Sequence, residues 1–334
     1  MGGPLQATEI VEGLYQLKTP MPEGNPLGFV LPYLFVGDGD CLLVDSGWNT
    51  PESFEALRRQ MDDLGLGLKA IRRLVVTHVH PDHYGLAGHV RQESGAQLIM
   101  HERDRAFIRS RYLEPEELLR IMARWLLTHG VPNGEMPDLQ SSSMPMRAFV
   151  AIAEPDRLLQ GGEVLEVGDF RLEVIWTPGH SPGHICFYDR RRKLLLTGDH
   201  VLPTITPNVS LHPEATGDPL GDYLASLRML EDLDVKRVLP AHEYAFDDLR
   251  GRLREIEEHH EYRLGEMVES LSAGGTTAYE VARGVTWATG SFDSFSPWMR
   301  RAAIGETLAH LEYLVGEGRI LRSEDGDVVR FRKV

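Results

Sequence analysis

Three histidines and an aspartate lie within one six-residue stretch, which constrains this chain more than any other feature. The stretch reads His78-Val79-His80-Pro81-Asp82-His83 and follows the apolar run 74–76. Side chains two positions apart at the end of a strand point to the same side, so His78 and His80 can bind one ion. So many metal-binding groups are not expected together in an ordinary core or surface segment. The stretch therefore predicts a metal centre.

Three later side chains extend the candidate ligand set, and each follows an apolar, β-prone run. They are His180, Asp199 and His242. Five histidines and two aspartates are more ligands than one tetrahedral ion uses, so the sequence predicts two divalent metal ions. Nitrogen and oxygen ligands without thiolate favour Zn²⁺, with Fe or Mn as alternatives.

The expected arrangement divides these ligands between two ions. An open site of three histidines would be formed by His78, His80 and His180, as in catalytic zinc centres. Asp82, His83 and His242 would face the second ion, and Asp199 would bridge the pair.

Two ions about 3.5–4 Å apart can hold a bridging hydroxide that attacks a carbonyl or phosphoryl group. Asp82 is the candidate catalytic acid, because a carboxylate beside two cations can relay a proton to the leaving group. Asp45 either orients a metal-bound imidazole or only forms a turn before Gly47. His184 is expected to pack behind the ligands.

The charge balance gives information about partners. The 334 residues carry a formal net charge of -15, whereas nucleic-acid binding usually requires a basic face. A small-molecule substrate is therefore favoured over nucleic acid, although a local basic groove stays open as an alternative. The basic run 190–193 is expected to be a solvated hairpin turn.

The sequence also bears on location. No apolar run approaches the roughly 20 residues of a membrane span, and the start of the chain shows no signal-peptide pattern. Cys41 and Cys186 both sit in apolar, strand-like segments, which predicts two buried thiols. A cytoplasmic location is the expectation.

Strand and helix patterns alternate along the chain, which predicts a layered α/β fold. Residues 1–250 are expected to form the catalytic domain, with one helix over 81–94 and an inserted helical cap at about 102–150. Met122, Trp125 and Leu126 would line the substrate pocket beneath this cap. Residues 251–334 read as a long helix followed by helix, helix, strand, strand, which is a winged-helix pattern.

The motif at 78–83, with His180, Asp199 and His242 in that order, resembles the metallo-β-lactamase superfamily over about residues 8–245. The resemblance implies an αβ/βα sandwich with the metal ions at one edge. Asp82 together with His83 is similar to the glyoxalase II and lactonase branches. The C-terminal pattern is similar to the branch that includes a mitochondrial endoribonuclease.

The residues and the resemblance together predict a dinuclear metal-dependent hydrolase. Its substrate would be a small ester, thioester or lactone, attacked by the metal-bridging hydroxide. One alternative is a phosphodiester-cleaving endoribonuclease of the same superfamily. The other is a non-catalytic protein that binds metal. The natural substrate, the oligomeric state and the role of the winged-helix domain are not predicted.

Overall fold

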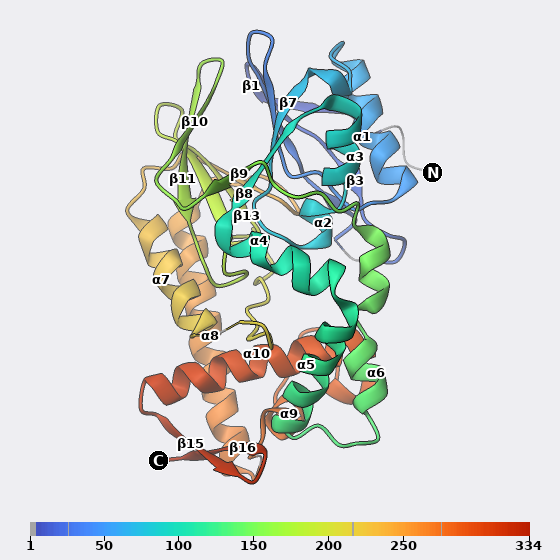
Figure 1. The fold of residues 1–334 in the computed structure, drawn as a ribbon. Coiled ribbons are helices and arrows are strands. Elements are labelled where there is room, and N and C mark those ends of the chain that lie inside the picture. Colours follow the sequence, from blue (N-terminus) through green and yellow to red (C-terminus); the bar gives the residue numbers. More distant parts are fainter. Residues whose placement is uncertain (1–4, 26, 216, 275) are drawn as a thin grey trace.

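The computed structural model describes residues 5–25, 27–215, 217–274 and 276–334. Two β-sheets lie face to face in one half of the molecule, and helices gather in the other half (Figure 1). The α/β sandwich expected from the sequence is therefore present.

The first sheet has seven strands in the order β1-β2-β5-β6-β7-β8-β9. Strands β1, β2, β5 and β6 pair antiparallel with their neighbours in this order. Strands β6, β7, β8 and β9 pair parallel, because helical crossovers connect β6 to β7 and β7 to β8. A short two-stranded pair, β3 (Thr19–Pro20) with β4 (Phe29–Val30), lies outside this sheet. The bounds of the seven strands are Thr8–Val11, Leu14–Gln16, Tyr33–Val36, Cys41–Val44, Ile71–Val75, Gln97–His101 and Arg157–Leu159.

The second sheet has five strands in sequence order, β10 to β14. The first four pair antiparallel, and β14 joins β13 in parallel after the crossover helix α7 (Pro219–Glu231). The bounds are Val164–Val167, Phe170–Trp176, Ile185–Asp189, Leu194–Gly198 and Arg237–Pro240.

A hydrophobic core fills the space between the sheets. Leu42, Val44 and Val75 from the first sheet share one buried cluster with Phe187 and Leu196 from the second. Strands β6 and β13 are buried at every position, because helices cover their outer faces as well. Cys41 and Cys186 are buried and free, as predicted.

Helices cover the outer face of each sheet, which gives the αβ/βα layering. Helix α1 (Pro51–Asp63) begins at a Thr50 cap with proline in its first turn, and it buries Leu57 and Met61 against the first sheet. The 3₁₀ turn η1 (Leu68–Ala70) leads from α1 into β7. On the other side, α7 and the long α8 (Leu249–Ser272) pack on the second sheet.

The expectation of one helix over 81–94 is wrong. Two helices, α2 (Pro81–Tyr84) and α3 (Ala87–Ser94), are separated at Gly85. The Leu86 amide donates to the Gly47 carbonyl at 2.9 Å, so an acceptor from another segment pulls it out of the helix. A Cβ on Gly85 would lie 2.2 Å from the Pro81 carbonyl oxygen, so this close approach requires glycine. The break sets α2 as a separate turn that carries Asp82 and His83.

The insertion at 102–150 consists of helical segments and runs from the sandwich towards the C-terminal helices (Figure 1). Met122 and Leu126 lie in a buried core shared with the C-terminal helices, and Trp125 packs against the same core. The expectation that these three line the pocket is therefore wrong, because the C-terminal segment supplies the apolar surface that they cover. The segments are α4 (Glu102–Ile108), the π-helical η2 (Arg109–Leu113), α5 (Pro115–Thr128), α6 (Met136–Ser141) and the 3₁₀ helix η3 (Met144–Phe149).

The C-terminal region follows the predicted order of helix, helix, strand, strand. Helix α9 (Ala278–Gly284) starts with a capping box between Thr277 and Glu280, and η4 (Phe292–Ser294) leads to α10 (Pro297–Gly316). The hairpin of β15 (Ile320–Asp325) and β16 (Val328–Lys333) packs on α5, α8 and α10. Within the described parts of the chain, none of the helices combines the length and hydrophobicity that a bilayer span requires.

Candidate metal centre

The candidate ligands lie on segments that follow the carboxyl ends of strands from both sheets. His78 and His80 follow β7, and α2 places Asp82 and His83 directly after them. His180 follows β11, and the remaining two residues follow strands of the same sheet. Because these strand ends meet at one edge of the sandwich, side chains from distant parts of the sequence come together. All seven predicted ligands converge there in two groups: His78, His80 and His180, and Asp82, His83, Asp199 and His242.

The first group has the spacing of three ligands around one ion. His78 Nε2 lies 2.9 Å from His80 Nδ1 and 3.3 Å from His180 Nε2, and His180 Nε2 lies 3.1 Å from His80 Nδ1. A tetrahedral zinc with Zn–N bonds of about 2.0–2.1 Å separates its nitrogen ligands by about 3.3 Å. Burial is the main factor that lowers the pKa of His78 and of His80, so both are neutral, the form that binds metal.

The second group combines two imidazoles with two carboxylates. His83 Nε2 is 3.7 Å from Asp82 Oδ1 and 3.3 Å from Asp199 Oδ2. His242 Nε2 is 3.4 Å from Asp82 Oδ2 and 3.4 Å from Asp199 Oδ1. The four side chains thus face one common point.

Asp199 reaches both groups. Its Oδ2 lies 3.6 Å from His180 Nε2 and 3.9 Å from His78 Nε2, in addition to its contacts with the second group. A single carboxylate that faces all of these nitrogens has the position of a bridging ligand.

The buried polar atoms of the second group lack ordinary partners. Within the described residues, His83 Nε2, His242 Nε2 and Asp199 Oδ1 are buried without a hydrogen bond. Burial lowers the pKa of both His83 and His242, because it disfavours the imidazolium form. The negative charges of Asp199 and Asp82 outweigh this effect, so the pKa of His83 is raised and that of His242 rises to about 10. The carboxylates thus require nearby positive charge, which a divalent cation would supply. The donor set therefore fits two metal ions with nitrogen and oxygen ligands.

Asp45 holds the other side of His83. Its Oδ2 lies 2.8 Å from His83 Nδ1, and its Oδ1 accepts a hydrogen bond of 2.8 Å from the Thr77 amide. Asp45 has a φ of 62°, a left-handed conformation that aspartate tolerates better than most residues. Of the two interpretations left open for Asp45, this contact favours the orientation of an imidazole.

Other ligands are oriented mainly by backbone groups. His180 Nδ1 lies 2.8 Å from the Asn208 carbonyl oxygen, and His242 Nδ1 lies 3.0 Å from that of Phe29. His184 is buried behind the ligands, where its Nε2 accepts a hydrogen bond of 3.2 Å from the Asp199 amide. The two backbone contacts leave Nε2 of each ligand imidazole free to face the centre.

Asp104 is a residue of the site that the sequence analysis missed. This buried carboxylate on α4 accepts hydrogen bonds from the Val79 amide at 2.8 Å, the Ser181 hydroxyl at 2.8 Å and the Gly183 amide at 2.6 Å. It therefore ties the loop of His78 and His80 to the loop of His180. Burial raises the pKa of Asp104, and these hydrogen bonds oppose that effect. Nothing in the local sequence distinguishes it from a surface aspartate.

A small apolar cluster borders the second group. Ser46 donates to the His83 carbonyl oxygen, and Trp48 follows two residues later. Trp48 packs with Met21 and Val30 and meets the Phe149 ring edge-on, with 5.2 Å between ring centroids. The same cluster reaches His242 through the neighbouring Phe29 carbonyl. The cluster of Met21, Val30 and Trp48 thus lies next to the segment of His83 and to the strand residue whose carbonyl holds His242.

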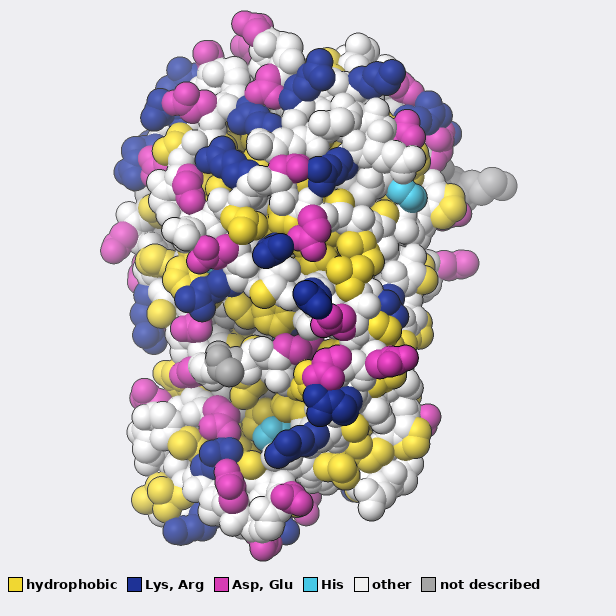
Figure 2. Space-filling model, viewed as in Figure 1, with side chains coloured by type: hydrophobic (Ala, Val, Ile, Leu, Met, Phe, Trp, Pro, Cys, Tyr) yellow, Lys and Arg dark blue, Asp and Glu magenta, His cyan; other side chains and the backbone are white. Residues whose placement is uncertain are grey.

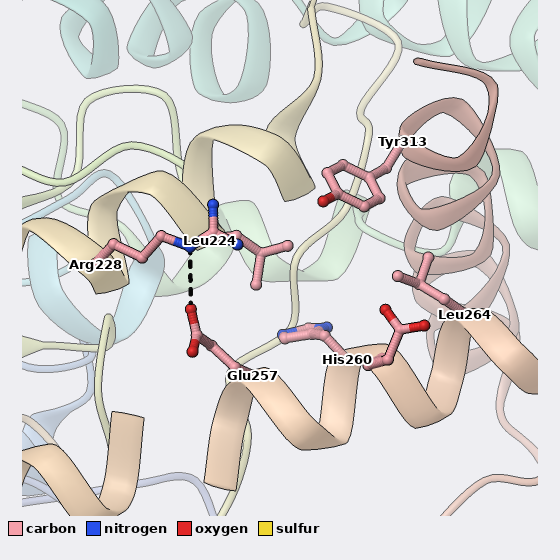
Figure 3. Close-up of a pocket in the computed structure, with 7 residues that line it drawn as sticks. Leu224, Arg228, Glu257, His260, Leu264 and Tyr313 are labelled. Carbon is pink, nitrogen blue, oxygen red and sulfur yellow. Dashed lines mark hydrogen bonds and ion pairs between the residues drawn. The ribbon is translucent and has the colours of Figure 1, made fainter. Parts of the chain in front are cut away.

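A separate cavity of about 240 Å³ lies between α7, α8 and α10, and none of its lining residues is a candidate ligand. Arg228 and Glu257 pair across it at 3.3 Å, while His260 and Tyr313 point inward (Figure 3). This cavity belongs to the packing of the C-terminal helices and not to the metal centre.

Comparison with known proteins agrees with this architecture. The family model of the metallo-beta-lactamase superfamily matches residues 25–242, and that of a metallo-beta-lactamase-like C-terminal domain matches residues 297–334.

Similar proteins match along almost the whole chain. A metallo-beta-lactamase family protein of Thermus thermophilus is 34% identical, with a TM-score of 0.82 over 98% of this chain and 100% of that one. A beta-lactamase domain protein from Burkholderia ambifaria is 27% identical, with a TM-score of 0.76 over 98% and 95% of the two chains. The probable metallo-hydrolase YqjP of Bacillus subtilis is 27% identical over 327 residues, which is 96% of this chain and 98% of that protein. The chain belongs to the metallo-beta-lactamase superfamily.

Proposed function

We propose that this metal-dependent hydrolase is dinuclear and cleaves a small ester, thioester or lactone. The observation that carries the proposal is the position of Asp199, whose carboxylate faces the nitrogens of both ligand groups within 3.9 Å. His78, His80 and His180 would hold one ion, and Asp82, His83 and His242 the other. Zinc is the metal that we favour, with Fe or Mn as alternatives. When bound, two divalent ions supply a Lewis acid and a water that is ionised near neutral pH.

Asp82 is the residue that we assign to proton transfer. Burial raises its pKa, but the positive charges of His83 and His242 outweigh this effect and lower the pKa. The carboxylate is therefore ionised at neutral pH and can accept a proton from the attacking water and pass it to the leaving group. Its side chain is 15% exposed, so it reaches the substrate side of the site.

Two further residues would position the ligands. Asp45 would fix the orientation of His83, and His184 would hold the backbone of Asp199 from behind. Neither touches the expected substrate, so each acts through the ligand that it contacts.

The surroundings of the site favour a small acyl substrate over RNA. The apolar cluster of Met21, Val30 and Trp48 beside these segments would suit an acyl group. The basic run 190–193 forms the turn between β12 and β13, and each of its four cations pairs with a carboxylate, so it offers no free cation to a phosphate chain. These pairs are Arg190 with Glu173, Arg191 with Asp169, Arg192 with Asp189, and Lys193 with Asp234.

The surface charge agrees with this preference. Basic and acidic side chains alternate over the face drawn in Figure 2, and no continuous basic stripe crosses the described residues there. An RNA-cleaving enzyme must neutralise several phosphates at once.

The test combines metal analysis with a substrate panel. Protein reloaded with Zn²⁺ should approach two equivalents per chain, and it should hydrolyse small thioesters or lactones but not single-stranded RNA. Asp199→Asn should lose activity by orders of magnitude. Asp189→Asn, which alters a buried aspartate of the same sheet in the hairpin turn, should keep it.

Each failure has its own meaning. Saturation at one zinc would contradict the dinuclear assignment. RNA cleavage that disappears in His80→Ala would favour the endoribonuclease alternative. Two bound ions without turnover of any ester, thioester, lactone or RNA would favour the non-catalytic alternative. The assignment to the cytoplasm stays a prediction.

A further inference from the structure

We infer that helix α10 supports the metal centre, because it holds the segment whose carbonyl oxygen orients His180. Gly305 and Glu306 of α10 act as positioning residues, and metal binding in turn stabilises the docking of α10. This inference rests on the proposed metal centre, with His180 as one of its ligands. It gives the C-terminal segment a role in the site.

The segment that supports His180 has no regular structure of its own. His180 Nδ1 lies 2.8 Å from the carbonyl oxygen of Asn208, which leaves Nε2 to face the metal ion. Asn208 lies in the connection between β13 and α7, where residues 201–212 form neither helix nor strand. Because no ladder of backbone hydrogen bonds fixes this stretch, the position of the carbonyl depends on the surfaces that the stretch contacts.

The two ends of this segment are held by different helices. Arg252 of α8 donates to the carbonyl oxygen of Leu202 at 2.7 Å and to that of Ile205 at 2.8 Å. Further along, the Leu211 amide donates to the Gly305 carbonyl oxygen at 3.0 Å. The segment is thus fixed to α8 at its start and to α10 at its end.

The residues around the orienting carbonyl also contact or pack towards α10. Asn208 Nδ2 donates to Glu306 Oε2 at 2.7 Å, and Asn208 Oδ1 accepts from the Ser210 hydroxyl at 2.5 Å. Val209 is fully buried in the same hydrophobic cluster as Ile304 of α10. Both ends of the Asn208 amide are therefore engaged, and Glu306 helps to set its carbonyl through the side chain.

A glycine within α10 allows this close approach. A Cβ on Gly305 would lie 3.2 Å from Ser210 Cβ and 3.3 Å from the Ser210 hydroxyl oxygen, which is closer than side chains normally pack. Ser210 is buried and bonded to Asn208, so a shift of Ser210 would displace Asn208 as well. Glycine is a poor helix former compared with alanine. The contact with this segment explains why glycine stands in the helix interior.

Coupling between the metal centre and α10 follows from these contacts. An ion that fixes His180 favours the same position of the segment that α10 favours, and such linkage is reciprocal. His180 lies in the region 25–242 that matches the superfamily model, whereas α10 begins the region 297–334 that matches the model of the C-terminal domain. The two matched regions thus share the support of one metal centre.

The principal test is Gly305→Ala in the 334-residue chain. The added methyl group should displace Ser210 and the Asn208 carbonyl, and so weaken the zinc ion held by the three histidines about tenfold in competition with a chromophoric chelator. Gly265→Ala is the matched control, because Gly265 lies inside α8 and a Cβ there would meet nothing within 4 Å. Helix propensity favours alanine at both positions, so urea unfolding of the metal-free variants separates an effect on the metal site from a loss of fold.

Cobalt in place of zinc tests the geometry around His180 directly. The visible absorption of bound Co²⁺ depends on how its ligands are arranged. The spectrum of Gly305→Ala should therefore differ from that of the wild type, whereas the spectrum of Gly265→Ala should not. A role of α10 in stability alone would leave both spectra unchanged.

A second pair of variants removes one hydrogen bond from its two sides. Glu306→Ala and Asn208→Ala should each weaken zinc binding about 2- to 10-fold, and the double variant should lose no more than Asn208→Ala alone. Glu306→Gln keeps an oxygen acceptor, so it should retain wild-type zinc affinity. Asn208→Ala keeps the carbonyl that meets His180, so its loss would act through position.

The outcomes separate this inference from the hydrolase function. Wild-type zinc affinity with an unchanged cobalt spectrum in Gly305→Ala would overturn the inference, and so would an equal loss in Gly265→Ala. Should Gly305→Ala not fold, additive losses in Asn208→Ala and Glu306→Ala would contradict it, and non-additive losses would support it. Wild-type protein that binds no zinc would overturn both proposals. Zinc binding with the expected losses, but without turnover of any ester, thioester or lactone, would count against the hydrolase proposal alone.

Discussion

Removal of the Asp104 carboxylate should loosen the metal centre although Asp104 itself is not a ligand. The carboxylate accepts hydrogen bonds from Val79, Ser181 and Gly183, at 2.6–2.8 Å, and joins the two loops of the His78, His80 and His180 group. In Asp104→Ala the three donors stay buried without this acceptor. The variant should therefore be less stable and bind the first metal ion more weakly.

The magnitude follows from the number of bonds. A hydrogen bond to a charged group contributes about 1.5–3 kcal/mol, so three at the lower end give about 4.5 kcal/mol. Removal of a buried charge, whose cost is seen in the raised pKa of Asp104, offsets part of this loss. We expect the free energy of unfolding to fall by about 3–4 kcal/mol. Zinc affinity at the three-histidine group should fall at least about tenfold, because the supporting hydrogen bonds set the ligand orientation.

Two measurements on the 334-residue chain test this expectation. Urea unfolding gives the change in stability, and competition with a chromophoric chelator gives the zinc affinity. Asp189→Ala is the matched control, since Asp189 is also buried and accepts from the Arg192 amide in a hairpin turn. It should lose stability without a change in zinc affinity. Wild-type zinc affinity in Asp104→Ala would refute the view that this carboxylate positions the two loops.

Three further predictions concern other parts of the chain. Asparagine also adopts the left-handed backbone of Asp45, so Asp45→Asn should keep the local fold. It should weaken zinc binding at the His83 group about 10- to 100-fold in the same competition assay, because its contact orients His83. Unchanged zinc affinity would contradict this orienting role. Leu126→Ala should lower the free energy of unfolding by about 2–5 kcal/mol in one cooperative transition, whereas a second, separate transition would show that the insertion and the C-terminal helices do not share a core. Burial and then the charge of Arg322 lower the pKa of His129 to about 4, so the unfolded chain takes up a proton on this residue at higher pH than the folded chain does. Stability should therefore be lost as pH falls from about 6.5 to 4, by up to roughly 3 kcal/mol from this group, and His129→Gln should reduce that loss in urea unfolding at each pH.

Much of the metal centre could be predicted because its ligands stand in short, recognisable patterns. The stretch from His78 to His83 follows a strand directly, and His180, Asp199 and His242 also follow strands. Strand ends of a layered α/β fold meet at one edge, so the order of elements already implies that these side chains converge. The structure shows two groups whose ligand atoms lie within 4.8 Å of one another.

Contacts between distant segments decided what the sequence did not show. The helix expected over 81–94 breaks because the Gly47 carbonyl competes for the Leu86 amide. Met122 and Leu126 were expected to line the pocket, but they lie in one buried core with residues of the C-terminal helices, and their helix α5 contacts α6 and β16.

The sequence by itself determined the cluster of candidate ligands at 78–83 and the order of the layers, because each follows from local periodicity or from residues only a few positions apart. Tertiary structure alone decided that Asp104 joins the two loops that carry His78, His80 and His180. The physical reason is that burial and charge pairing depend on which surfaces meet. Arg109 and Arg111 look alike along the chain. Arg109 nevertheless pairs with the Glu114 carboxylate, whereas Arg111 forms no ion pair within 4.0 Å among the described residues.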